Sequence, residues 1–179
     1  QGTVNKYYSE TITTKAERDL TFNNKISFGY GAEYKYDWGD YTTLTFTSQT
    51  KGHLKNLGIF ANTGYKFNDN QSLSMHIRND DHKETGGNKT YKVNFTQLYK
   101  NLKFGLTHST GLKNPSLYEL YGSSSSHSGS TGIDSEKSTT NELYAEYIFS
   151  KNIKFNSTFY RTNMKDRIKI KSDWSGYEN

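Results

Sequence analysis

The chain has 179 residues and a formal net charge of +5, and its 15 tyrosines and 10 phenylalanines stand against a hydrophobic content of only 31%. The absence of cysteine excludes a disulfide framework and a cysteine-based metal site, and the scattered, modest charge excludes the basic cluster expected of a nucleic-acid-binding protein. No apolar run approaches the roughly 18 residues of a membrane-spanning helix, and the aromatic content argues against disorder.

Apolar and polar residues alternate with a period of two along most of the chain, which is the pattern of strands with two different faces. The first segment precedes Asn23 and places Arg18, Leu20 and Phe22 on one face. The next, 26–38, has Ile, Phe, Tyr, Ala and Trp on one face and Ser, Gly, Glu, Lys and Asp on the other. Six further segments follow the same pattern: 57–67, 72–78, 91–96, 102–107, 142–149 and 153–159.

Short and long connectors alternate between these predicted strands. The short connectors contain asparagine, as tight hairpin turns require; they are Asn23-Asn24, 68–70, Lys100-Asn101 and 150–152. The long polar connectors are 39–55, 80–89 and 111–139. This alternation predicts an antiparallel meander with short turns at one rim and long loops at the other, as in membrane β-barrels.

The fold class predicted from this pattern is all-β: an antiparallel transmembrane β-barrel meander of about eight strands. In lipid every backbone N–H and C=O must be paired, so a spanning sheet must close on itself, and only its outer face must be apolar. Aromatic residues near strand ends, such as Tyr36, Trp38, Phe67, Tyr99 and Phe149, are typical of interfacial girdles. A soluble antiparallel sandwich or barrel also shows this alternation, and it would be extracted without detergent.

Two segments carry a family resemblance. Residues 111–122 read GLKNPSLYELYG and contain the only proline, and residues 134–147 read DSEKSTTNELYAEY. Together they resemble the barrel of TonB-dependent outer-membrane receptors, most closely the cobalamin-receptor branch, although siderophore and haem receptors share these elements. Ser135 stands where the family usually has proline. The resemblance is good over about 111–170, and the earlier strands match only by pattern.

The resemblance implies a plugged barrel of the roughly 22-stranded class, in an outer membrane of the Gram-negative type. Such receptors import a large scarce nutrient: cobalamin, a ferric siderophore or haem. We therefore expect residues 1–179 to be a partial barrel domain, without the plug and without the closing strand. The expected partners are outer-membrane lipid, the cobalamin or iron-chelate ligand, and TonB, which would act through the plug region of the parent protein. The alternative is a complete small eight-stranded barrel with a structural or adhesion role.

Neither enzymatic activity nor a cofactor is predicted. The five histidines are scattered and show no metal-binding spacing. Glu142 and Glu146 lie about 13 Å apart along one strand, which exceeds the separation of catalytic carboxylate pairs.

Loop and inner-face aromatics are the candidate ligand contacts. We select Tyr118, Tyr121 and Trp174, with Arg161 and Lys113 as polar partners, because aromatic side chains give a large contact area at little entropic cost. The alternative for Tyr118 and Tyr121 is that they anchor the base of a loop at the membrane interface.

A weak candidate for a cation site is the acidic stretch around His82. Asp80, Asp81 and Glu84 are close in sequence, and calcium favours clustered carboxylates. An acidic loop tip is more often simply solvated.

Overall fold

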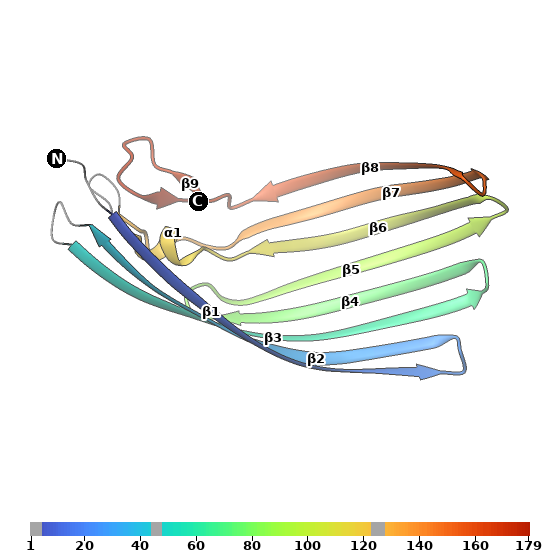
Figure 1. The fold of residues 1–179 in the computed structure, drawn as a ribbon, viewed down its shortest axis with the longest axis horizontal. Coiled ribbons are helices and arrows are strands. Elements are labelled where there is room, and N and C mark those ends of the chain that lie inside the picture. Colours follow the sequence, from blue (N-terminus) through green and yellow to red (C-terminus); the bar gives the residue numbers. More distant parts are fainter. Residues whose placement is uncertain (1–4, 44–47, 123–127) are drawn as a thin grey trace.

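The computed structural model describes residues 5–43, 48–122 and 128–179 of the chain (Figure 1). Eight consecutive strands form one antiparallel sheet: β1 (Asn5–Phe22), β2 (Ile26–Thr43), β3 (Ser48–Asn68), β4 (Gln71–His82), β5 (Gly86–Tyr99), β6 (Leu102–Lys113), β7 (Glu136–Ser150) and β8 (Ile153–Lys165). A five-residue helix, α1 (Leu117–Tyr121), lies between β6 and β7, and the short strands β9 (Lys169–Ile170) and β10 (Tyr177–Glu178) pair after β8. No helix in the described ranges is long and apolar enough to cross a bilayer.

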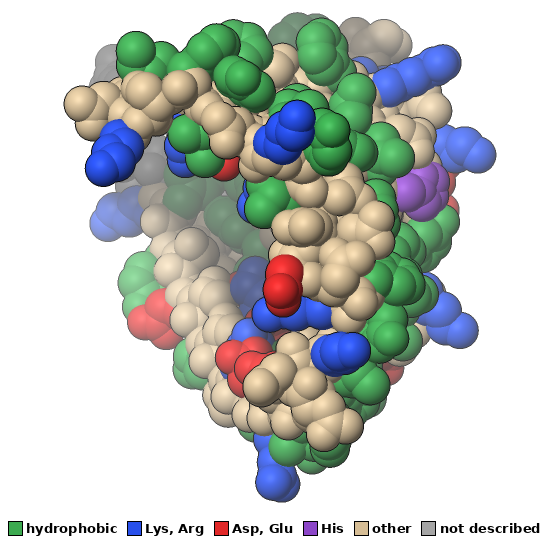
Figure 2. Space-filling model, turned by 90° about the vertical axis from the view of Figure 1, so that its right-hand side faces the viewer, with side chains coloured by type: hydrophobic (Ala, Val, Ile, Leu, Met, Phe, Trp, Pro, Cys, Tyr) green, Lys and Arg blue, Asp and Glu red, His purple; other side chains and the backbone are tan. Residues whose placement is uncertain are grey.

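The sheet is a curved wall with chemically different faces. Hydrophobic side chains line its convex face, where Ile12, Ile59 and Phe159 are 62%, 58% and 67% exposed. Figure 2, seen along the strands from the short-turn end, shows green side chains gathered along the outer edge and a hollow on the inner side. Glycines and charged residues such as Gly58, Glu33 and Arg78 occupy alternate positions, on the concave side. This arrangement confirms the predicted strand faces.

The short turns also form as predicted. In the β1–β2 turn, Asn23 and Asn24 have φ values of 50° and 54°, and the N–H of Lys25 donates to the carbonyl of Phe22 at 3.1 Å. Positive φ at both central residues defines the type I′ turn, whose twist matches that of the flanking strands and which favours asparagine. Lys100, in the β5–β6 turn, has a φ of 53°.

The long connectors were predicted with the wrong extent. Most of the predicted connector 39–55 is strand, because β2 and β3 stay paired out to Thr43 and Ser48. The predicted connector 80–89 reduces to the turn 83–85, since β4 pairs with β5 up to His82 and Gly86. Beyond the apolar band most residues of these strands are polar, so the clean alternation is lost from the sequence while the ladder of backbone hydrogen bonds continues.

The sheet is open at both sides. Within the described residues β1 pairs only with β2 and β8 only with β7. The strands therefore form a section of wall, and not the closed eight-stranded barrel that was the alternative prediction.

The buried apolar residues gather on the concave side at the long-loop end. They are Tyr41, Leu54, Leu117, Leu120 and Ile133. Tyr118, Tyr121, Ile168 and Tyr177 pack around them. One further buried aromatic residue in the described ranges, Phe60, lies apart from this group, with its ring over Gly31. The described core thus holds the loops against the wall, whereas the body of the sheet presents its apolar side chains outward.

Candidate functional site

Helix α1 is the part of the loop that packs against the inner wall. The Ser116 hydroxyl accepts from the Glu119 N–H at 3.2 Å, and the Glu119 carboxylate accepts from the Ser116 N–H at 2.7 Å. This reciprocal pair is a capping box, which satisfies two otherwise unpaired donors at the start of the helix. Leu117 and Leu120 are buried against the wall. The NPSLYELYG part of the family-like segment therefore contains the helix Leu117–Tyr121, which begins at its own capping box.

Glycine at position 52 allows the helix to lie this close to β3. A Cβ atom there would lie 2.5 Å from Cδ2 of Tyr121 and 3.0 Å from Cδ2 of Leu117. The absence of a side chain at Gly52 therefore makes room for both helix residues.

Three tyrosines from different elements form one aromatic cluster above the wall. The Tyr118 ring of α1 lies 5.7 Å from the ring of Tyr7 on β1 and 5.5 Å from that of Tyr41 on β2, both nearly edge-to-face. The rings of Tyr7 and Tyr41 are 5.8 Å apart. Edge-to-face pairs at such distances are favourable, so Tyr118 joins the helix to the two long strands.

Tyr121 donates a hydrogen bond to the carboxylate of Glu84 at 2.6 Å. Glu84 lies in the β4–β5 turn and also pairs with the ammonium group of Lys83 at 3.2 Å. Desolvation by burial, and then the hydrogen bond and charge of Glu84, raise the pKa of the Tyr121 phenol to about 12. The hydrogen bond from Tyr121, followed by that from Lys83, outweighs desolvation and lowers the pKa of Glu84.

The Tyr121–Glu84 contact predicts a shifted phenol titration. In full-length protein in detergent, the difference in phenolate absorbance between wild type and Tyr121→Phe should show a midpoint at about pH 12. With Glu84→Gln the midpoint should fall toward the ordinary value of 10.0. A phenol whose pKa is raised on folding stabilises the fold below its unfolded pKa, and this contribution is lost as the pH rises through the folded value. An unchanged midpoint in Glu84→Gln would mean that the contact does not form in solution.

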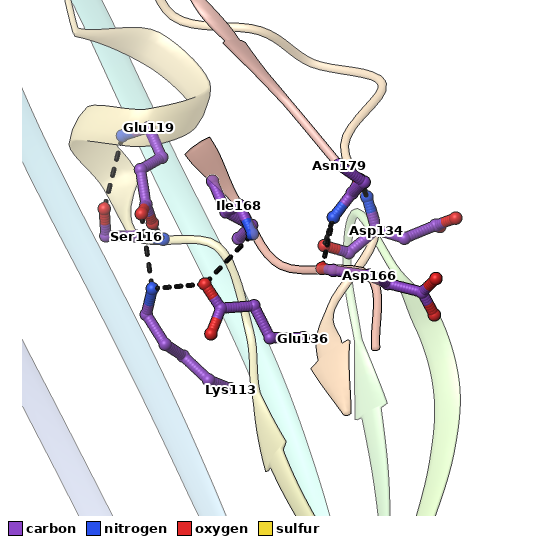
Figure 3. A network of polar contacts seen from close by, with 8 residues as sticks. All are labelled: Lys113, Ser116, Glu119, Asp134, Glu136, Asp166, Ile168 and Asn179. Carbon is purple, nitrogen blue, oxygen red and sulfur yellow. Dashed lines mark hydrogen bonds and ion pairs between the residues drawn. The ribbon is translucent and has the colours of Figure 1, made fainter. Parts of the chain in front are cut away.

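Lys113 ties three parts of the loop region together, as Figure 3 shows. Its ammonium group lies 3.4 Å from the Glu119 carboxylate and 3.1 Å from that of Glu136, and Glu136 also accepts from the N–H of Ile168 at 3.0 Å. The side-chain amide of Asn179 makes a second connection. It donates to the backbone carbonyls of Asp134 and Asp166 at 3.1 and 2.7 Å. Helix α1, the start of β7 and the segment after β8 are thereby held as one unit.

A pocket of about 500 Å³ lies between this unit and the inner faces of β1–β4. Its polar lining includes Glu10, Lys35, Asp37, Asn56 and His82, and its apolar lining includes Leu54, Leu117 and Tyr118. Lys35 and Asp37 pair at 3.0 Å. Aromatic edges beside paired charges suit a polar ligand with an extended ring surface.

Deeper on the concave face, Arg78 is the centre of a charge network. Its guanidinium lies 2.9 Å from Glu33 and 2.8 Å from Asp80, and Asn56 donates to Asp80 at 2.6 Å. A Cβ at position 58 would lie 2.1 Å from an Arg78 nitrogen, so Gly58 provides the space for the guanidinium. The inner wall is therefore charged and internally paired.

The structure brings some of the sequence-predicted ligand residues together and separates others. Tyr118, Tyr121 and Lys113 meet in the loop unit described above. Trp174 lies in the segment between β9 and β10, with 68% of its surface exposed. Arg161 lies on β8 opposite Asn141 of β7 and lines a pocket with the outward-facing Leu143 and Phe159, so it points away from the concave site.

The three candidate cation ligands do not form a cluster. Asp80 is paired with Arg78 on the concave face, whereas Asp81 is exposed and lies opposite Leu57 on the convex face. Glu84 is held by Tyr121. No group of three or more His, Asp or Glu side chains that could hold a metal occurs among the residues that the structure describes. Residues 123–130 read SSSSHSGS, and 123–127 lie outside the described residues.

Several important residues of the site were not predicted, namely Tyr7, Tyr41 and Arg78. Tyr41 was assigned to a connector, but continuing the period of two beyond Trp38 places it on the same face as Lys35 and Asp37. This signal was available in the sequence. No comparable signal predicts the contact between Arg78 and Glu33, because these residues are 45 positions apart.

Comparison with known proteins gives a consistent result. Residues 1–177 match the family model described as TonB dependent receptor-like, beta-barrel. The structure is similar to the siderophore receptor PirA from Pseudomonas aeruginosa, with a TM-score of 0.77 and 15% identity over 97% of this chain and 37% of that receptor. It is also similar to the ferric enterobactin receptor PfeA (TM-score 0.80, 19% identity, 90% of this chain and 28% of that one) and to the copper transporter OprC (0.76, 13%, 92% and 31%).

Identities this low show a shared fold. The chain spans about a third of the length of these solved receptors. No curated protein matches the sequence. The resemblance to the cobalamin branch stays a prediction, since the structures named here are siderophore and copper proteins.

Proposed function

Because the chain belongs to the TonB-dependent receptor family as part of its β-barrel, we propose that it forms a section of the wall of an outer-membrane receptor that imports an iron chelate. The family is one of receptors and transporters and not of enzymes. The observation that carries the proposal is the division of the sheet into an apolar convex face and a charged, internally paired concave face. Such a wall suits lipid on one side and a wet or plugged lumen on the other.

The open edges of the sheet support a larger barrel. The outer backbone groups of β1 and β8 have no ladder partner within the described residues, and an unpaired backbone group in hydrocarbon costs several kcal/mol. We propose that further strands of the parent protein continue the wall on both sides, which makes residues 1–179 a partial barrel domain. TonB would act through the plug region of the parent.

The proposed ligand is a ferric siderophore. The solved relatives PirA and PfeA are siderophore receptors by name, and the loop-side pocket is lined by Tyr41 and Tyr118 beside the paired Lys35 and Asp37. Of the predicted contacts, Tyr118 lines this pocket, while Lys113 and Tyr121 position the helix that carries it. Trp174 is proposed as an outer contact for an arriving ligand. Cobalamin is the second candidate, because of the residues in 111–122 and 134–147 that resemble that branch.

Uptake by the full-length parent tests this function. The receptor would be expressed in a Gram-negative strain that lacks its own siderophore and cobalamin receptors, and radiolabelled ferric enterobactin and radiolabelled cobalamin would be supplied separately. We expect TonB-dependent accumulation of the iron label. Accumulation of cobalamin alone would transfer the proposal to the second ligand, and accumulation of neither would contradict import of these nutrients.

A single variant connects the uptake to the pocket. Tyr118→Ala should weaken ligand binding about tenfold, because truncation of a central aromatic contact typically costs more than about 1 kcal/mol. Tyr99→Ala is the matched control, since Tyr99 is 62% exposed at the opposite, short-turn end. Equal binding by the two variants would remove the pocket from the proposal.

A further inference from the structure

A groove opens on the convex face where β5 and β6 separate. Their ladder ends at Lys92 and Ser109, whereas β6 and β7 stay paired out to Lys113 and Glu136. Beyond the last pair, the N–H of Tyr91 donates to the hydroxyl of Thr110 at 2.9 Å in place of a backbone partner. The separation leaves a volume of about 720 Å³ near the long-loop end.

Lysines border this groove on both sides. Lys89 of β5 forms one side, and Lys137 and Lys165 form the other, where they are direct cross-strand neighbours of β7 and β8. Thr110, Thr139 and Asn163 lie between them. Like charges directly opposite each other on a sheet are destabilising. An anion bound beside Lys137 and Lys165 would therefore reduce the repulsion between them.

Little of this positive charge is neutralised by the protein. Lys137 pairs with Asp166 at 3.7 Å, but in the described part of the chain Lys89 and Lys165 form no ion pair. Asp81, on β4 opposite Gly87 of the groove lining, is a second acidic residue on the convex face. Three lysines against two carboxylates leave an excess of positive charge.

A second, apolar pocket of about 610 Å³ lies directly toward the short-turn end on the same face. Its apolar lining includes Val93, Phe95, Leu106, Leu143 and Phe159, while His108, Asn141 and Arg161 line its polar part. Asn141 is 2.7 Å from Nδ1 of His108 and is the cross-strand partner of Arg161. Arg161 likewise forms no ion pair among the described residues. It adds a fourth cation at the boundary between the apolar pocket and the basic groove.

We propose that these two adjoining pockets bind a phosphate-bearing membrane lipid, with its acyl chains on the apolar pocket and its phosphates on Lys89, Lys165 and Arg161. This inference rests on the proposed function, because it requires the convex face to lie in a membrane. The charge arrangement selects the ligand: cations and hydroxyl groups directly beside an apolar surface match an anionic headgroup attached to hydrocarbon. Hydrogen bonds between cationic side chains and phosphate are among the strongest in proteins.

The test uses full-length receptor in detergent and native mass spectrometry with purified diphosphoryl lipid A as the probe. The variant K89Q/R161Q/K165Q should retain this lipid about 100-fold less well, at about fivefold for each cation removed near an anionic headgroup. The control K66Q/K92Q/K103Q removes three charges from the concave face. It should bind the lipid as wild type does. The charge-conserving variant K89R/K165R should also bind normally, which separates charge from disrupted folding.

The probe is varied to identify what is recognised. Monophosphoryl lipid A should bind more weakly than the diphosphoryl form, and an excess of inorganic phosphate should not displace the lipid. Equal loss in the two triple variants, equal binding of the two lipids, or displacement by free phosphate would each overturn the proposal. Ligand uptake is measured in parallel. If a variant loses lipid binding but retains uptake, the result bears on the lipid site and leaves the proposed receptor function intact. If the wild-type protein is extracted without detergent, the proposed membrane function itself is refuted.

Discussion

Replacing Arg78 by leucine is expected to destabilise the full-length protein by roughly 2–3 kcal/mol in urea unfolding. The substitution leaves Asp80 and Glu33 without the guanidinium that now lies within 2.9 Å of both. Breaking a fully buried pair costs about 3–5 kcal/mol. The smaller value applies here because the side chains of Arg78 and Glu33 remain 22% and 26% exposed.

The control for Arg78 is Lys15→Leu on the same concave face. Lys15 pairs with Glu17 at 2.6 Å, but the two side chains are 44% and 52% exposed, and such a pair contributes about 0–1 kcal/mol. Adding Asp80→Asn to Arg78→Leu should recover part of the lost stability, since it removes the unpaired charge. Equal effects of Arg78→Leu and Lys15→Leu would show that the network is effectively solvated.

Leu120→Ala is expected to release helix α1 from the inner wall. Leu120 is 1% exposed at the centre of the loop-side core, and a buried leucine truncated to alanine costs about 2–5 kcal/mol. The helix has only five residues, and its other attachments are the Tyr118 ring contacts, the Tyr121–Glu84 hydrogen bond and the Lys113–Glu119 ion pair, so the loss should appear as local opening. Chymotrypsin cleavage near Tyr118 should accelerate at least about 30-fold, because proteolysis follows the population of the open form when opening is fast.

Ile170→Ala serves as the control for Leu120. Ile170 also lies in the loop region, in β9, but is 45% exposed, so its truncation should leave the cleavage rate nearly unchanged. Urea unfolding of the barrel should respond less to Leu120→Ala than local cleavage does. Unchanged cleavage in Leu120→Ala would show that the tyrosine cluster and the Lys113 ion pairs hold the loop without the apolar core.

The candidate site was predicted only in part. Tyr118 and Tyr121 were selected as loop or inner-face aromatic residues, and the structure places both on the concave side. Their partners Tyr7 and Tyr41 come from distant strands and Glu84 from the β4–β5 turn, and no local pattern connects them. Asp80 and Asp81 illustrate the opposite case. They are adjacent in sequence, yet alternation of side chains along a strand sends them to opposite faces.

The alternating pattern of the chain was enough to specify the strands, their order and the face that each side chain takes, because the side-chain period of a strand is local and lipid or solvent selects one face along its whole length. Asparagines at the short turns marked the hairpins for an equally local reason, the left-handed backbone that those turns need. The curvature of the wall, the extension of β2 and β3 beyond the apolar band, the seat of α1 on Gly52 and the Arg78 network depended on the folded chain. Each of these arises from contacts between residues far apart in sequence, whose distances are set by register and curvature and by no single segment.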